Sequence, residues 1–178
     1  TDRSRGLGDV YKRQHMVNDH PGYNPENLAY VYIGAVDSTG RAKLIEETQR
    51  LPEVDAITTC YNLPFWGASG NNVYLPGDDR ELFNIADLYD VGNDYLNVLE
   101  IPIVEGQYFT ENTTSSQEIL VSRNFIEYMK PFADWKDGAV GKTVQITGHD
   151  TKSESMPLFT IRGVFEDFRL GSIAGEDP

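Results

Sequence analysis

The side chains that could act as nucleophiles, general bases or metal ligands are few and widely spaced in this sequence. The histidines are His15, His20 and His149, and the single cysteine is Cys60. Nucleophilic catalysis needs a hydroxyl or thiol with a base beside it, and none of the histidines stands in a recognised nucleophile motif. His15, Asp19 and His20 could surround a metal ion, but their spacing matches no standard metal site. Cys60 lies in an apolar stretch and is best explained as a small buried side chain.

Paired carboxylates are the other candidates for chemistry, because two facing acids can hydrolyse a glycosidic bond. Two pairs are close in the sequence, Asp87 with Asp90 and Glu166 with Asp167. Acidic residues are so frequent here that such pairs also arise by chance. The acidic turn at 78–81 lacks the alternating oxygen ligands of a calcium loop. We therefore predict no catalytic, cofactor-binding or metal-binding residues, and an acid-pair hydrolase is the weakest alternative.

The charge of the chain argues against several classes of partner. Its 178 residues include 15 basic and 28 acidic side chains, which gives a formal net charge of −13. Binding to DNA, RNA or an anionic membrane surface needs a basic stripe, so none of these is an expected partner. Hydrophobic residues make up 39% of the chain, which suits a folded core. No apolar run approaches the ~20 residues that span a bilayer.

An aromatic segment at 61–67, with the sequence YNLPFWG, is the strongest candidate for a contact with another molecule. Tyr61 ends a predicted strand and Phe65 and Trp66 follow it, and exposed aromatic side chains in such a loop can anchor a partner protein. The same side chains could instead form a lid that packs over the end of the sheet. The sequence favours the lid somewhat over the partner site, and both interpretations stay open at this point.

The elements that must position this loop are predicted to form a βαβ unit. The apolar run 28–36 has the β-branched and aromatic content of a strand that is buried on both faces. Residues 41–51 place apolar side chains at helical spacing, and Pro52 ends that helix. Residues 54–61 are predicted to form a second strand. Strand, helix and strand within so short a stretch indicate a parallel crossover.

The rest of the chain is predicted to alternate strands with short helices. Loops are expected at 62–80 and around 148–157, and short helices are expected after Asn93 and after Ser122. The remaining strands are expected at 82–91, 118–121, 143–147 and 159–168.

Both ends of the chain differ from its interior. Residues 1–14 show no apolar periodicity, and the stretch 9–14, DVYKRQ, looks like the translation of a transposase end sequence. We predict that 1–14 is a disordered scar of sequence assembly. At the other end, residues 170–178 follow a predicted strand without adding a further helix or strand. This predicts a fold that is truncated at its C-terminus.

Several short motifs stand in a recognisable order and spacing, at 93–96 (NDYL), 99–102 (LEIP), 105–109 (EGQYF), 119–122 (ILVS), 140–146 (VGKTVQI) and 159–168 (FTIRGVFEDF). Together they resemble the motifs of MacB-like periplasmic core domains, which belong to bacterial ABC-transporter permeases of the FtsX-like superfamily. Gln107 stands where the family usually has arginine. The resemblance covers nearly everything outside the predicted scar.

The resemblance implies an α+β fold in two parts. Residues 15–92 would form a porter-like part with βαβ units, and residues 93–178 would form a mixed, β-rich, sabre-like part. The strand at 159–168 would return to the porter sheet. Such a domain emerges between the first and second transmembrane helices of a permease, on the periplasmic side of the bacterial inner membrane.

The resemblance also implies a function without catalysis and without a cofactor in this domain. ATP would be hydrolysed in a separate cytoplasmic subunit or domain, and the transmembrane helices would transmit the motion outward. The periplasmic domain would then change its contacts with a second permease copy and with a periplasmic adaptor protein or lipoprotein, in efflux or lipoprotein export. An alternative is a freestanding secreted binding module that uses residues 61–66.

Overall fold

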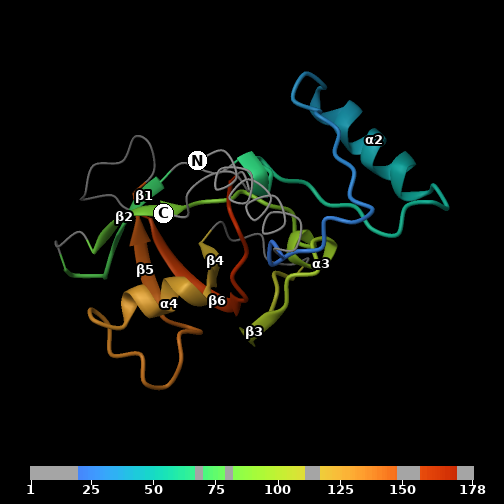
Figure 1. The fold of residues 1–178 in the computed structure, drawn as a ribbon. Helices are drawn as coiled ribbons and strands as arrows, with labels where there is room; N and C mark the ends of the chain where they lie inside the picture. Colours follow the sequence, from blue (N-terminus) through green and yellow to red (C-terminus); the bar gives the residue numbers. More distant parts are fainter. Residues whose placement is uncertain (1–19, 67–69, 79–81, 111–116, 148–156, 172–178) are drawn as a thin grey trace, which may run out of the picture.

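The computed structural model describes residues 20–66, 70–78, 82–110, 117–147 and 157–171. Figure 1 shows a mixed α+β fold, in which one helix stands apart from a sheet that carries the shorter helices. This confirms the predicted fold class. Along the chain the elements are α2 (Ser38–Gln49), the 3₁₀ turn η1 (Pro64–Trp66), β1 (Gly70–Tyr74), β2 (Phe83–Asp87), α3 (Tyr95–Val98), β3 (Ile103–Gly106), β4 (Glu118–Ser122), α4 (Arg123–Met129), β5 (Thr143–Ile146) and β6 (Leu158–Phe165).

Strand β6 is the centre of the six-stranded sheet. One of its edges is divided between two antiparallel partners, β5 along 158–160 and β3 along 163–165. Its other edge pairs in parallel with β4 along 160–165. Strand β1 continues the sheet by pairing antiparallel with β5, and β2 pairs antiparallel with β1. The β6 sequence LFTIRGVF is rich in β-branched and aromatic residues, which suits a strand with neighbours on both sides.

A glycine is required where β3 pairs with β6. Gly106 lies opposite Gly163 and has a φ angle of 76°. A Cβ atom on Gly106 would lie 2.3 Å from the carbonyl oxygen of Arg162, which is closer than real Cβ atoms come to any neighbour. Because glycine lacks this atom, the two backbones can approach closely.

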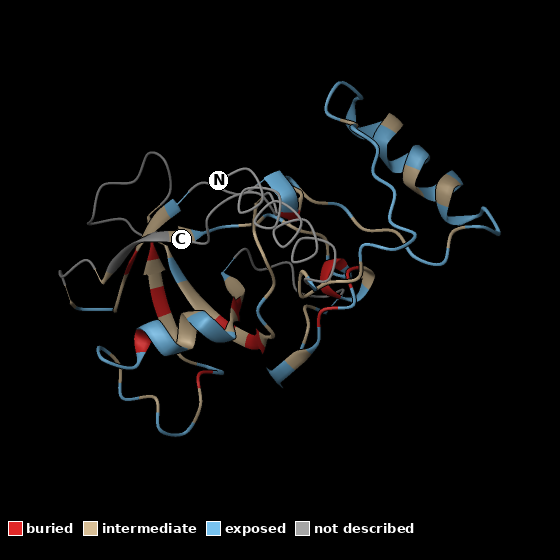
Figure 2. Cartoon of the chain, viewed as in Figure 1, coloured by how far each residue is buried: buried red, intermediate tan, exposed pale blue. Residues whose placement is uncertain are grey.

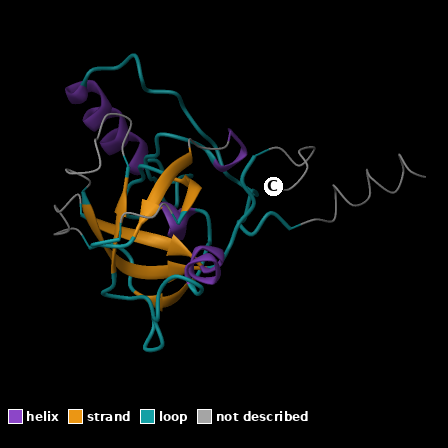
Figure 3. Ribbon diagram, turned by 90° about the vertical axis from the view of Figure 1, so that its left-hand side faces the viewer, coloured by secondary structure: helices purple, strands orange, loops and turns teal. Residues whose placement is uncertain are grey.

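Three apolar clusters form the core, and Figure 2 shows their buried residues along the sheet, α3 and α4. The cluster between α4 and the β1–β5 part of the sheet contains Val73, Met129, Val144 and Ile146. The cluster around α3 contains Tyr95, Leu96, Leu99 and Ile101. The cluster along β4 and β6 contains Val121, Ala139, Ile161 and Val164. Helix α4 contributes side chains to the first and third clusters and therefore packs on the sheet (Figure 3).

Residues 25–57 form an arm that leads away from the sheet, with α2 at its outer end (Figures 1 and 2). None of these residues is buried. The helix predicted at 41–51 is confirmed as α2, which begins earlier because the Asp37 side chain caps it by accepting a 2.7 Å hydrogen bond from the Gly40 N–H.

The predicted βαβ unit is wrong for the described residues. Neither 28–36 nor 54–61 forms a strand, and Cys60 makes only an isolated bridge with Val91. The hydrogen bonds of a strand go to a neighbouring strand, so a strand-forming sequence stays irregular where no described segment lies beside it. Consequently Tyr30, Val31 and Tyr32 are exposed instead of buried.

Most of the other predicted elements are present. The strands predicted at 118–121, 143–147 and 159–168 are confirmed as β4, β5 and β6, and the helix predicted after Ser122 is α4. The strand predicted at 82–91 is shorter and ends at Asp87. The predicted loop 62–80 contains β1, because pairing with β2 and β5 outweighs the low strand propensity of the sequence GNNVY.

Candidate partner-contact surface

Three aromatic rings gather where the arm returns to the sheet. Between ring centroids, Tyr30 lies 5.8 Å from Phe65 and 5.9 Å from Trp66, and Phe65 lies 5.6 Å from Trp66. The ring planes are inclined to one another by 56° to 78°, close to the edge-to-face arrangement that aromatic pairs favour. We call Tyr30, Phe65 and Trp66 the ring cluster.

The ring cluster lies at the molecular surface. Tyr30 and Trp66 are each 59% exposed, and Phe65 is 40% exposed. Of the three residues in η1, only Pro64 is buried. A lid would bury these rings against the sheet, whereas the exposed rings leave a face that another molecule can cover. Edge-to-face contact between the rings also holds each side chain in place before anything binds, which lowers the entropy cost of binding.

The turn that carries Phe65 and Trp66 is fixed by backbone hydrogen bonds. The Pro64 carbonyl accepts a 2.8 Å hydrogen bond from the Gly171 N–H, in the segment that follows β6. The Trp66 N–H donates to the Leu63 carbonyl at 3.0 Å, and the Tyr61 N–H donates to the Asp90 carbonyl at 2.9 Å. The rings therefore stand on a support that is tied to the sheet on two sides.

The structure brings together a set of aromatic residues that differs by one from the sequence prediction. Phe65 and Trp66, which the sequence placed in one loop, are in contact. Tyr61 is exposed and makes no ring contact with any described residue. Tyr30 takes its place in the cluster, and sequence reasoning missed it because the run 28–36 was interpreted as a buried strand. The density of aromatic residues in that run was the available signal.

Two of the carboxylates considered for hydrolysis, Glu166 and Asp167, serve as local structural contacts. Glu166 forms a 3.1 Å ion pair with Arg123 at the start of α4. Asp167 accepts a 2.8 Å hydrogen bond from the Asn124 N–H, which is one of the free donors of the first turn of the helix. Burial raises the pKa of the Asp87 carboxyl.

The described part of the chain contains no group of three or more His, Cys, Asp or Glu residues that could hold a metal ion. The His20 Nδ1 atom accepts a 3.1 Å hydrogen bond from the Gly22 N–H. His15, Asp19 and His149 lie outside the described residues. Cys60 is half-buried, and burial raises the pKa of its thiol, so the thiolate that would react or bind metal is disfavoured.

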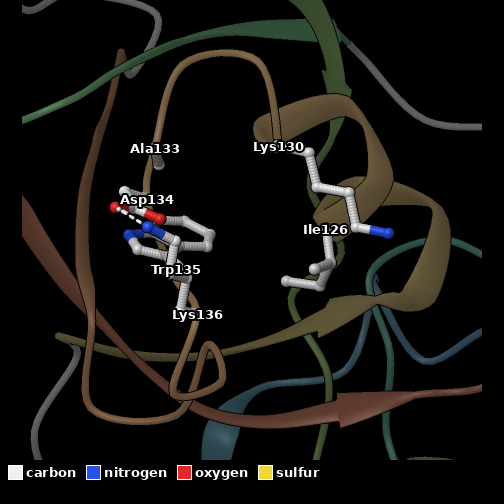
Figure 4. Close-up of a pocket in the computed structure, with 6 residues that line it drawn as sticks. All are labelled: Ile126, Lys130, Ala133, Asp134, Trp135 and Lys136. Carbon is white, nitrogen blue, oxygen red and sulfur yellow. Dashed lines mark hydrogen bonds and ion pairs between the residues drawn. The ribbon is translucent and has the colours of Figure 1, made fainter.

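A hollow of about 330 Å³ lies between α4 and the loop that follows it. Figure 4 shows Ile126 and Lys130 on the helix side and Ala133, Asp134, Trp135 and Lys136 on the loop side. Its lysines are already paired, Lys136 with Asp134 at 2.9 Å and Lys130 with Glu127 at 2.6 Å. The hollow therefore offers an apolar wall with a neutral rim, and it has no unpaired charge to orient a ligand.

A family model for the MacB-like periplasmic core domain matches residues 12–178 of this sequence. The chain belongs to this family. It is the periplasmic core domain of an ABC-transporter permease, as the sequence motifs predicted. In the described residues of this MacB-like domain, no helix has the length and apolar character needed to cross a membrane.

A solved structure supports the fold of this MacB-like domain. The crystal structure of the periplasmic region of MacB from Actinobacillus actinomycetemcomitans matches with a TM-score of 0.51 and 19% sequence identity. The match covers 73% of this chain and 52% of that chain, so the MacB-like domain here spans about half the length of its relative. No curated protein matches the sequence. The predicted division at residue 92 into porter-like and sabre-like parts stays a prediction.

Proposed function

We propose that this MacB-like domain is a non-catalytic, extracytoplasmic part of an ABC-transporter permease that binds a partner protein or cargo through the ring cluster. ATP hydrolysis would take place in a separate cytoplasmic subunit or domain. The parent permease would be embedded in the inner membrane together with a second copy. Its transmembrane helices would transmit the motion driven by ATP hydrolysis to the periplasmic side. A periplasmic adaptor protein or a lipoprotein is the expected partner.

The observation that carries this proposal is the exposure of three mutually packed rings on a fixed support. Tryptophan and tyrosine side chains are over-represented among residues that dominate binding energies, because they bury a large rigid area at a small entropic cost. Trp66 and Tyr30 each keep 59% of their surface exposed and are therefore free to contribute such area.

The backbone support links the ring cluster to the sheet and so favours a coupled contact. Pro64 is bonded to Gly171, which lies six residues beyond the end of β6 at Phe165. The Tyr61 N–H is bonded to Asp90, which lies between β2 and α3. A shift of the sheet relative to the membrane anchors would therefore move the rings together with it.

The test is to replace Phe65 or Trp66 by alanine in the full-length permease and to measure partner retention and transport. We expect each variant to retain the adaptor or cargo about tenfold less well, because loss of an aromatic anchor costs on the order of 2 kcal/mol. The rate of ATP hydrolysis without partner should stay unchanged.

Phe132→Ala is the matched control. Phe132 is 41% exposed, close to the 40% of Phe65, but it lies beyond α4 and outside the ring cluster. We expect Phe132→Ala to retain the partner normally. Equal losses for Phe65→Ala and Phe132→Ala, or no loss for either, would show that the ring cluster is not the contact surface.

A further inference from the structure

Among the described residues, the arm is hydrogen-bonded through its backbone to the rest of the domain only at its two ends, and Tyr30 adds a ring contact with Phe65 and Trp66. All hydrogen bonds between backbone groups that the described residues show for 25–57 remain within the arm. Since none of its residues is buried, no core packing fixes its direction either. The two attachments, at 21–24 and at 58–64, together with the ring contact of Tyr30, therefore decide how the arm stands relative to the sheet (Figure 1).

The first attachment, at 21–24, is held by several hydrogen bonds. The Pro21 carbonyl accepts a 2.7 Å hydrogen bond from the Arg169 N–H, and the Asn24 N–H donates to the Leu99 carbonyl at 2.9 Å. The Asn24 side chain donates to Glu100 Oε1 at 2.9 Å. This end of the arm is bonded through both backbone and side chain.

The second attachment is made by residues 58–61 against residues 89–92. The Gly92 N–H donates to the Thr59 carbonyl at 2.7 Å, and the Tyr61 N–H donates to the Asp90 carbonyl at 2.9 Å. A larger residue at position 92 would crowd this contact, because a Cβ atom there would lie 2.9 Å from Thr58 Oγ1, 3.0 Å from Thr59 Oγ1 and 3.2 Å from the Thr59 nitrogen. The two segments, 58–61 and 89–92, are thus in direct contact.

Three buried hydroxyl groups at this second attachment have no hydrogen-bond partner among the described residues. They belong to Thr58, Tyr89 and Tyr95. The groups lie near one another. The pKa of Tyr95 is raised by burial and by the nearby Cys60 and Tyr89. The pKa of Tyr89 is raised to about 12 by burial and by the nearby Asp87 and Cys60. A buried hydroxyl without a partner has lost its bonds to water without replacement, which disfavours the closed contact.

We propose that the contact between residues 58–61 and 89–92 is a joint that opens while the sheet stays folded. Opening breaks two backbone hydrogen bonds, which costs free energy. It also returns three hydroxyls to water, which lowers the free energy of the open state, so the two effects offset one another. The first attachment, at Pro21 and Asn24, then acts as the pivot of the arm. Local openings of this kind are less costly than global unfolding where few apolar contacts are lost. The apolar contacts at this joint are those of the partly buried Cys60 and Val91 with the cluster around α3. The joint does not depend on which partner binds the ring cluster.

The experiment is amide hydrogen exchange on the complete 178-residue chain, compared with Tyr89→Phe and Tyr95→Phe. Each substitution removes one unpartnered hydroxyl and keeps the ring. The Tyr61 and Gly92 amides report on the joint, and the Ile161 amide, which donates to Lys142 at 2.8 Å within the sheet, reports on global unfolding. We expect the two joint amides to exchange about fivefold more slowly, or slower still, in both variants.

Tyr108→Phe is the matched control, because the Tyr108 hydroxyl donates a 2.9 Å hydrogen bond to the Ile101 carbonyl. Its loss should speed exchange at Ile161 and should not slow exchange at Tyr61. Gly92→Ala tests the opposite direction, and it should speed exchange at Tyr61 while Ile161 keeps its rate.

Two outcomes would contradict the proposal that this contact is a joint. Unchanged or faster exchange at Tyr61 and Gly92 in both tyrosine variants would mean that the hydroxyls are already well bonded. Equal exchange rates at Tyr61, Gly92 and Ile161 in every variant would mean that the contact opens only when the whole domain unfolds. No partner is present in this experiment, so its result is separate from the test of the ring cluster.

Discussion

Arg162 on β6 and Glu118 on β4 form an ion pair of 3.0 Å across the only parallel strand pair among the described residues. Their side chains are 21% and 28% exposed, whereas the other described ion pairs are much more open to water. Arg162 also donates through Nε to the Tyr108 carbonyl at 2.6 Å. One guanidinium thus ties β4, β6 and the segment after β3 together.

Neutralising this pair should destabilise the domain. We expect Glu118→Gln to lower the free energy of unfolding by about 1–2 kcal/mol, because a half-buried arginine loses a charged acceptor. Glu46→Gln is the control, since Glu46 pairs with Arg50 on the exposed face of α2, where such a pair contributes less than about 0.5 kcal/mol. Urea unfolding followed by circular dichroism gives both values. Similar losses for the two variants would contradict the prediction.

The two capped helices should respond differently to loss of their caps. Ser122 Oγ accepts a 3.1 Å hydrogen bond from the Phe125 N–H at the start of α4. We expect Ser122→Ala to lower the free energy of unfolding by about 1 kcal/mol, because α4 packs on the core. Asp37→Ala should loosen α2 without moving the unfolding midpoint, because α2 buries no residue. Amide exchange within α2 checks the second outcome.

Core and arm should differ in their sensitivity to truncated side chains. Ile101 is 1% exposed in the cluster around α3, and Ile101→Ala should cost about 2–5 kcal/mol of stability. Leu44 is 41% exposed on α2, and Leu44→Ala should change stability by less than about 0.5 kcal/mol. Thermal unfolding of both variants provides the comparison. A large loss for Leu44→Ala would show that the arm is packed in solution.

The Glu105 carboxylate should determine the position of the loop before β5. Its Oε1 atom accepts hydrogen bonds from the Ala139 N–H at 3.0 Å and the Val140 N–H at 3.2 Å. We expect Glu105→Ala to lower the free energy of unfolding by about 1–3 kcal/mol, since two backbone donors lose their acceptor. Glu105→Gln keeps a carbonyl oxygen there and should lose less. Urea unfolding separates the two, and equal losses would count against this role.

Alkaline pH should weaken the domain through Tyr89. Burial, helped by Asp87 and Cys60, raises the Tyr89 pKa from 10.0 to about 12 in the folded chain. The unfolded chain therefore releases this proton first, and stability is full below about pH 10 and falls as the pH rises toward about 12. Tyr89→Phe should reduce the slope of that fall. Melting temperatures measured across this pH range test the prediction, and identical slopes in both proteins would contradict it.

Some elements were predictable because their own residues carry the signal. Ser122 is a cap followed by apolar residues at helical spacing, and the β6 sequence is rich in β-branched and aromatic residues. Phe65 and Trp66 could be placed in one loop because they are neighbours in an aromatic segment after a predicted strand. Tyr30 could not be placed beside them, because its position depends on how residues 25–57 return to the sheet.

The sequence by itself determined the family, the acidic character and most of the sheet, because motif order, charge and short-range periodicity are properties of neighbouring residues. Only the tertiary structure decided that 28–36 stays outside the sheet, that β1 joins it, and that Tyr30 completes the ring cluster. Strand pairing and side-chain clustering depend on segments far apart in the chain. A strand-forming sequence becomes a strand only where a partner lies beside it.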